Sequence, residues 1–137
     1  MINRLKRCPA SPNCVCSDDT DSSHGIPPLR VAGEFMPAWT ALLNYLEHEP
    51  EFTIIEDTGS YLRAEARTRI LRFVDDVEFM ARPGDDIIAM RSASRLGYSD
   101  LGTNRRRLEA LRSVLIDAGV VRTIERDAAQ RRRRFIA

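Results

Sequence analysis

Four short segments in the middle of the chain, separated by turn-forming residues, constrain the fold more than any other feature. Each segment either alternates apolar with polar side chains or is rich in β-branched and aromatic residues, which favours strands. The segments are residues 52–56, 61–67, 73–80 and 87–91. Turn signals at 57–60 and 82–86 separate the first pair and the last pair. An uninterrupted run of strands predicts an antiparallel meander.

An amphipathic helix is expected on each side of this run. Pro37 suits the first turn of a helix that ends near Pro50. Its apolar residues recur with helical spacing: Trp39, Leu42, Leu43 and Leu46. After the strands, Leu108, Leu111 and Leu115 mark a second helix, and Gly119 suits its C-terminal end. The sequence therefore predicts an α+β fold of order α-β-β-β-β-α, a four-stranded antiparallel meander with both helices packed on one face.

The 137 residues divide into three parts. Residues 1–35 are rich in Cys, Pro and Ser and are expected to form an irregular segment that packs on the domain. Residues 36–119 form the α+β domain, and residues 120–137 form a basic tail. The first residues contain no apolar run and no stretch of the chain resembles a membrane span, so a cytoplasmic protein is expected.

The charge of the chain is nearly balanced, with 21 basic against 20 acidic side chains, and all the bases except Lys6 are arginine. This balance argues against nucleic acid as the partner. The tail is basic, with Arg122, Arg126 and Arg131–Arg134. It is interpreted as a solvated end, and the alternative is a contact with RNA, anionic lipid or an acidic partner. Arginine suits paired and buried sites better than lysine because its planar fork offers five donors.

Three cysteines lie within nine residues at Cys8, Cys14 and Cys16, and His24 follows. Three interpretations remain open. The thiols are reduced, or Cys8 and Cys14 form a disulfide in an oxidising compartment, or the three cysteines and His24 bind a metal. The Cys-x-Cys spacing is tighter than that of common zinc sites, so the metal interpretation is the weakest.

Three carboxylates lie on the strand at residues 73–80. Asp75 shares a side with apolar residues and therefore needs donors or a proton. Asp76 and Glu78 share the other side. They are candidates for a general acid and base, and the alternative is a charged face paired with Arg63 and Arg67.

The segment 91–107 combines Arg, Ser, Gly, Asp and Asn in a loop that leads into a helix N-terminus. Backbone N–H groups and guanidinium forks at such a place can bind phosphate or carboxylate. The alternative is structural, with Asp100 or Asn104 capping the helix and with Arg91 and Arg95 paired to Asp75 or Asp100. There is no Gly-rich phosphate loop and no zinc-protease or serine-hydrolase motif, so no cofactor is expected.

Three stretches give the chain a family resemblance: 11–15 (Ser-Pro-Asn-Cys-Val), 69–79 (Arg-Ile-Leu-Arg-Phe-Val-Asp-Asp-Val-Glu-Phe) and 91–102 (Arg-Ser-Ala-Ser-Arg-Leu-Gly-Tyr-Ser-Asp-Leu-Gly). With them the chain resembles, over about residues 8–118, the bacterial and plastid domain of unknown function 1499. Cys16 stands where that family usually has a serine, which weakens the metal interpretation. Many members are exported or membrane-anchored. The resemblance implies no established activity.

These observations predict one connected cluster of charged and polar side chains. Its members are Arg69, Arg72, Asp75, Asp76, Glu78, Arg91, Ser94, Arg95, Asp100, Asn104 and Arg105. The leading hypothesis is a non-enzymatic binding or accessory module that holds an anionic small molecule or a partner protein segment. The first alternative is an enzyme that uses Asp76 or Glu78 as acid or base with an arginine clamp. The second is an interaction domain in which the cluster is a structural charge lattice.

Overall fold

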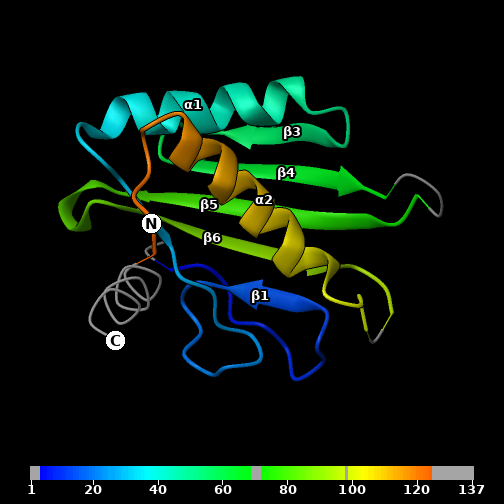
Figure 1. Cartoon of the computed structure of the whole chain (residues 1–137). Coiled ribbons are helices and arrows are strands. Elements are labelled where there is room, and N and C mark those ends of the chain that lie inside the picture. The colour runs from blue at the N-terminus through cyan, green and yellow to red at the C-terminus, as the bar shows by residue number, and fades with distance from the viewer. Residues whose placement is uncertain (1–3, 69–71, 98, 125–137) are drawn as a thin grey trace, which may run out of the picture.

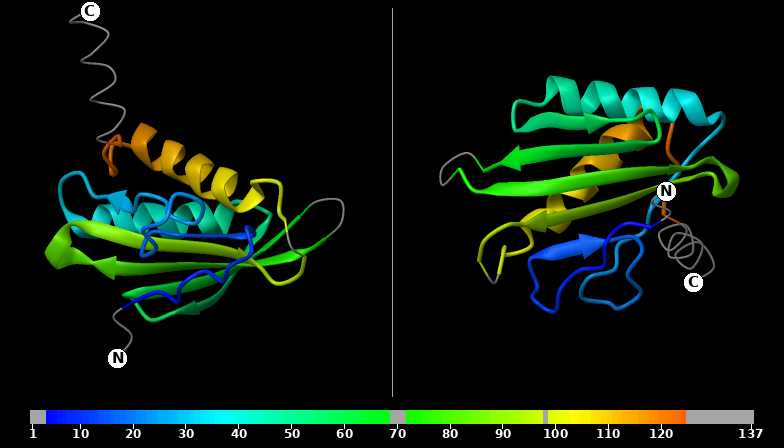
Figure 2. Two further views of the ribbon diagram at one scale, coloured as in Figure 1. Left: turned by 90° about the horizontal axis from the view of Figure 1, so that it is seen from below. Right: turned by 180° about the vertical axis from the view of Figure 1, so that it is seen from behind.

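A computed structural model of the chain describes residues 4–68, 72–97 and 99–124 (Figure 1). These residues form one six-stranded sheet, and both of the α-helices described lie on the same face of it (Figure 2). The elements are β1 (Cys14–Cys16), β2 (Leu29–Arg30), α1 (Phe35–His48), β3 (Phe52–Asp57), β4 (Tyr61–Arg67), β5 (Val74–Arg82), the 3-10 turn η1 (Pro83–Asp85), β6 (Ile87–Ser94) and α2 (Thr103–Asp117). The predicted α+β class and the order α-β-β-β-β-α are confirmed.

The four predicted strands pair in chain order, all antiparallel, from β3 to β6. The N-terminal segment, expected to be irregular, adds two short strands: β1 and β2 both pair antiparallel with β6. β6 extends to Ser94, beyond the predicted residue 91, because Arg91–Ala93 also pair with β1. Strands of two and three residues carry no alternation, which is why their sequence did not predict them.

The two helices have the predicted places. α1 begins at Phe35, so Pro37 lies in the first turn, where an N–H group has no partner inside the helix. α2 begins at Thr103, and Gly119 just beyond its end has a φ of 79°. A residue with a side chain is strained at that φ, so glycine is suited to end this helix.

The main core lies between the helices and the sheet. The alternation predicted for β4 is observed, with Leu62, Ala64 and Ala66 buried. Trp39 and Leu42 of α1 and the apolar stripe of α2 cover this face. The opposite face of the sheet carries charged side chains of β4 and β5: Arg63, Glu65, Asp76 and Glu78. Part of it is covered by residues 4–8, which we call the strap, where Leu5 packs with a small buried cluster: Cys16, Met80 and Ala89.

Candidate functional site

A buried ion pair joins the sheet to α2. Asp75 of β5 lies on the helix side, as the alternation predicts, and its Oδ2 atom is 2.8 Å from Nη1 of Arg107. The two side chains are each only 4% exposed. The sequence suggested Arg91 or Arg95 as partners of Asp75, and this was wrong. Both point to the other face of the sheet, where each binds another carboxylate.

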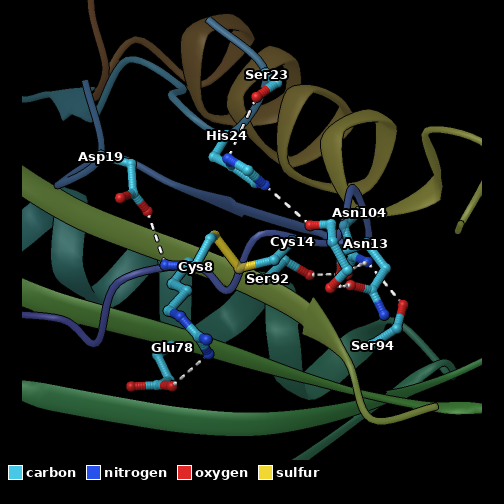
Figure 3. Close-up of a disulfide and its surroundings, with 12 residues drawn as sticks. Cys8, Asn13, Cys14, Asp19, Ser23, His24, Glu78, Ser92, Ser94 and Asn104 are labelled. Atoms are coloured by element: carbon cyan, nitrogen blue, oxygen red, sulfur yellow. Dashed lines mark hydrogen bonds and ion pairs between the residues drawn. A yellow bond between two sulfur atoms is a disulfide. The ribbon is translucent and has the colours of Figure 1, made fainter. Parts of the chain in front are cut away.

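Asn104, fully buried in the first turn of α2, connects four parts of the chain. Its amide nitrogen donates to the Asp100 carboxylate, the Ser94 hydroxyl and the Asn13 carbonyl at 2.7–3.2 Å. Its amide oxygen accepts from the Ser92 hydroxyl at 2.6 Å and from Arg107 at 2.9 Å. Figure 3 shows Asn13, Ser92, Ser94 and Asn104 gathered beside β1. We call the set Asp75, Ser92, Ser94, Asp100, Asn104 and Arg107 the internal network.

Asp100 caps α2, one of the roles predicted for it. Its carboxylate accepts the backbone N–H groups of Gly102 and Asn104 at 2.8 and 3.1 Å. Burial pushes the pKa of this carboxyl up, but the hydrogen bonds from Asn104 and Gly102 outweigh burial and the pKa is lowered. The carboxylate is therefore committed to the helix end rather than to a ligand.

On the opposite face of the sheet, Arg95 binds two carboxylates. Its Nε and Nη2 atoms each lie 2.8 Å from an oxygen of Asp76, and Nη2 is 2.6 Å from Glu65. Arg63 approaches the same Asp76 carboxylate at 3.5 Å. The hydrogen bonds from Arg95 lower the pKa of Asp76. A carboxyl group with a lowered pKa is ionised at neutral pH and is a poor proton donor.

Glu78, the second acid or base candidate, is also occupied. It accepts a hydrogen bond of 2.9 Å from the Tyr61 hydroxyl and lies 3.4 Å from Nη1 of Arg91. Burial and the charge of Glu78 raise the pKa of Tyr61. Asp76 and Glu78 thus lie on a charged face that was the alternative to catalysis. Of the two arginines predicted to pair with them, Arg63 contacts Asp76, whereas Arg67 lies 3.7 Å from Glu65 of its own strand.

Two arginines of α2 hold the N-terminal segment through its backbone. Arg105 donates to the carbonyl of Gly25 at 2.9 Å. Arg112, buried and absent from the predicted cluster, donates to the carbonyls of Pro27 and Pro28 at 2.6 and 2.9 Å. Each contact uses several donors of one planar group, a geometry that lysine does not offer. Of the other predicted members, Arg72 is exposed at the β4–β5 connection and Arg69 lies outside the described residues.

The end of β4, the start of β5, the end of β6 and the start of α2 lie at the same end of the sheet (Figures 1 and 2). This end displays large apolar side chains: Leu101 is 83% exposed, Leu96 is 76% exposed and Phe73 is 51% exposed. Phe73 and Leu96 lie directly beyond the β5–β6 pairing, which continues past Asp75 and Ser94 through the Arg95 N–H to the Val74 carbonyl. We call Arg72, Phe73, Leu96, Leu101 and Arg106 the loop end.

Leu101 is held in a conformation that side chains disfavour, with a φ of 54°. The Ser99 hydroxyl accepts its N–H at 3.3 Å, and its carbonyl accepts from Arg106 at 2.7 Å. Asn13 donates to the Gly97 carbonyl of the same loop at 2.7 Å. Strained backbone persists only where surrounding contacts enforce it, and such positions cluster at functional sites.

The cysteines settle the interpretations left open. Cys8 of the strap and Cys14 of β1 form a disulfide, while Cys16 is a free and buried thiol (Figure 3). The expectation of three reduced thiols was wrong. The proposed metal ligands are not assembled either, because the disulfide occupies two of them. Burial raises the pKa of the Cys16 thiol, so it stays protonated and unreactive.

His24 links the β1–β2 loop to the segment enclosed by the disulfide. Its ring nitrogens contact the Ser11 carbonyl at 2.9 Å and the Asp21 carboxylate at 2.7 Å. Both partners are acceptors, so the doubly protonated ring fits best. The Ser11 carbonyl and the Asp21 carboxylate accordingly raise the pKa of His24, and bonds from Ser23 and His24 lower that of Asp21 to about 2.

A pH dependence of stability follows from the raised pKa of His24. The stabilisation is fully present below the pKa of the unfolded chain, about 6.5, and is lost as the pH rises through the higher folded pKa. Urea unfolding between about pH 5.5 and 8.5 should therefore show the wild-type chain losing more stability with rising pH than His24→Gln. Identical pH slopes for the two chains would contradict the protonated ring.

Comparison with known families adds one finding. Residues 4–115 match the family described as Protein of unknown function (DUF1499). The chain belongs to this family. No curated protein and no solved structure matched the chain. The match covers all the sheet and nearly all of α2, so the fold described above is that of a DUF1499 domain.

The three stretches by which the chain resembles the DUF1499 family meet in the structure. Asn13 of the first contacts the third through the Gly97 carbonyl and a backbone bond to Ser94. The second and third contain adjoining parts of β5 and β6, where Asp75–Glu78 pair with Arg91–Ser94. The stretches thus supply Asp75, Ser92, Ser94 and Asp100 to the internal network, and Phe73, Leu96 and Leu101 to the loop end. Among the described residues, no helix has the length and apolar character that crossing a bilayer requires.

Proposed function

We propose that this DUF1499 domain is a non-enzymatic docking module that binds an anionic lipid surface through the loop end. The exposure of Phe73, Leu96 and Leu101 carries the proposal. Side chains exposed to this degree project into solvent rather than line a hollow. Apolar side chains that project beside basic ones suit insertion into the boundary between lipid headgroups and acyl chains.

Charge complementarity supports an anionic partner. Within residues 4–68, 72–97 and 99–124, neither Arg72 nor Arg106 has a carboxylate in salt-bridge distance. The acid of this region, Asp100, is turned into the helix end. Basic residues near an anionic bilayer contribute about 1 kcal/mol each.

The size of the apolar surface favours a bilayer over a folded protein. A stable protein interface needs about 20–30 residues from each side, whereas the loop end offers three exposed apolar side chains. A peripheral membrane contact needs only a few inserted side chains supported by charge. The internal network and Arg106 hold the β6–α2 loop in place before binding, which lowers the entropy lost on docking.

The charged cluster gives less support to the two alternatives, binding of an anionic small molecule and acid–base catalysis. The guanidinium groups of Arg91 and Arg95 are engaged by carboxylates of the same chain, and that of Arg105 by backbone carbonyls. A ligand anion there would have to displace these partners. Asp76 is held ionised by Arg95, and Glu78 is held by Tyr61 and Arg91, which argues against the acid and base pair. In this proposal the cluster is a structural lattice that supports the loop end.

The disulfide supports a place of action other than the expected cytoplasm. Disulfides persist in oxidising compartments and are reduced in the cytosol. The Cys8–Cys14 bond fixes the strap to β1, and the two cysteines are six residues apart in sequence. We therefore place the docking module in an oxidising compartment.

Sedimentation with lipid vesicles tests the docking proposal. The wild-type chain should sediment with vesicles that contain phosphatidylserine, less at high salt, and little with phosphatidylcholine alone. The triple variant Phe73→Ser, Leu96→Ser, Leu101→Ser should bind at least about tenfold more weakly, because each buried apolar side chain contributes about 1.5–3 kcal/mol. Arg72→Ala should weaken binding and reduce its salt dependence.

A matched control removes exposed apolar side chains elsewhere. Met36 of α1 is 61% exposed and Val114 of α2 is 47% exposed, so Met36→Ser, Val114→Ser changes surface hydrophobicity away from the loop end. This variant should bind vesicles like wild type. Equal loss in both variants, or no binding to anionic vesicles by the wild-type chain, contradicts the proposal. In the second case a protein partner becomes the better interpretation of the loop end.

A further inference from the structure

A hollow at the opposite end of the sheet gathers three arginines. It has a volume of about 550 Å³ and lies between the strap, the β1–β2 loop and the β5–β6 hairpin. Arg4 and Arg7 of the strap and Arg82 at the end of β5 line it. The acidic side chains in its wall are Asp18 and Asp85. The hairpin lies at the end of the sheet away from the β6–α2 loop in both ribbon views, so the hollow is separate from the loop end (Figures 1 and 2).

The strap that carries Arg4 and Arg7 is fixed to the domain at both of its ends. The Leu5 N–H donates to Asp18 at 3.0 Å, and the Cys8 N–H donates to Asp19 at 2.9 Å. The Leu5 side chain is buried, and the disulfide ties Cys8 to β1. The backbone is therefore held at Leu5, next to Arg4, and at Cys8, next to Arg7.

The charges in the wall leave an excess of positive charge. Asp18 binds Nη1 and Nη2 of Arg82 at 2.7 and 2.6 Å, so this carboxylate is already neutralised by one of the three arginines. Within the described residues, no hydrogen bond or ion pair engages the guanidinium groups of Arg4 and Arg7. The charge of Arg4 also acts on Asp18 and that of Asp85 acts on Arg82, so three guanidinium groups in the wall face two carboxylates. The side chains of Ser17 and Thr20 add hydroxyl groups to the wall.

We infer that this hollow is a binding site for a small phosphate-bearing molecule, held by Arg4 and Arg7 against the fixed Arg82–Asp18 pair. The planar guanidinium fork matches two oxygens of a phosphate group, and two forks can hold two phosphates or two edges of one. The Ser17 hydroxyl accepts the Met90 N–H at 2.9 Å, which leaves its own proton for a phosphate oxygen. The site does not depend on the docking proposal, because it shares no residue with the loop end.

Calorimetric titration with inorganic pyrophosphate at low salt tests the site. The wild-type chain should bind with one site per chain, and Arg4→Ala, Arg7→Ala should bind about tenfold more weakly for each guanidinium removed. The matched control is Arg30→Ala, Arg122→Ala, which removes the same charge from exposed positions outside the hollow. This control should bind like wild type.

Three outcomes overturn the inference: no pyrophosphate binding by the wild-type chain, unchanged binding by Arg4→Ala, Arg7→Ala, or equal loss in the control pair. The last would show attraction by net charge alone. The two double variants, Arg4→Ala, Arg7→Ala and Arg30→Ala, Arg122→Ala, alter exposed side chains only, so their unfolding curves should match that of the wild-type chain. A changed unfolding curve would reveal a folding defect independently of pyrophosphate binding. Asp18→Asn, which weakens the hold on Arg82 and Leu5, should also weaken pyrophosphate binding even though it removes a negative charge.

Discussion

Replacing Arg107 by alanine should lower the free energy of unfolding by about 3–5 kcal/mol. The variant leaves the Asp75 carboxylate buried under α2 without its cation. It also removes a donor to Ser92 and Asn104, at 3.2 and 2.9 Å. An unpaired buried charge costs far more than a lost surface contact. Urea unfolding followed by circular dichroism measures the change through the midpoint, with the slope unchanged.

Two further variants separate the buried pair from a general effect of charge. Arg122→Ala removes an exposed arginine and should change stability by less than about 0.5 kcal/mol. Asp75→Leu combined with Arg107→Met removes both charges and should recover much of the loss, because apolar groups of similar size replace a buried ion pair at little cost. A loss below about 1 kcal/mol in Arg107→Ala contradicts the buried pair as a structural element.

Breaking the Cys8–Cys14 disulfide should have the next largest effect on the free energy of unfolding. Replacing both cysteines by serine is expected to lower the free energy of unfolding by about 2 kcal/mol, the value for a closed loop of this length. The strap should then loosen, so the backbone N–H at position 8, which donates to Asp19 in the wild-type chain, should exchange with solvent faster. Unfolding curves with and without reductant measure the first effect, and hydrogen exchange measures the second.

Cys16 supplies the control for this prediction. Cys16→Ala keeps the disulfide, so reductant should destabilise this variant as much as wild type and should leave the double serine variant unaffected. A wild-type chain whose stability does not respond to reductant would contradict the disulfide and, with it, the placement in an oxidising compartment.

The helices and the four long strands could be predicted from the sequence because their patterns are local and repeated. Alternation in β4 and the leucine stripe of α2 each report burial residue by residue. β1 and β2 could not be predicted, because they are strands only through pairing with β6, which lies more than fifty residues further along the chain. Pairing at that distance has no local signature in residues 14–16 or 29–30.

Part of the candidate site could be predicted from the sequence. The alternation of β5 placed Asp75 inside and Asp76 and Glu78 outside, as observed. The partner of Asp75 was missed, although Arg107 lies three residues from Asn104 and next to Leu108 on the buried stripe of α2. Extending that stripe by one turn would have found it. The exposed Leu96 and Leu101 could not be predicted, because they lie outside helices and strands, where no periodic pattern reports exposure.

The most direct test of the docking proposal places a reporter at the loop end. Leu96→Trp adds an indole at a position that is 76% exposed, whereas the native Trp39 is buried in the core and serves as a constant background. With phosphatidylserine vesicles the added fluorescence should shift to shorter wavelength and be quenched by brominated acyl chains, and phosphatidylcholine vesicles should produce neither change. An emission spectrum that stays unchanged with anionic vesicles would contradict insertion of the loop end into a lipid surface.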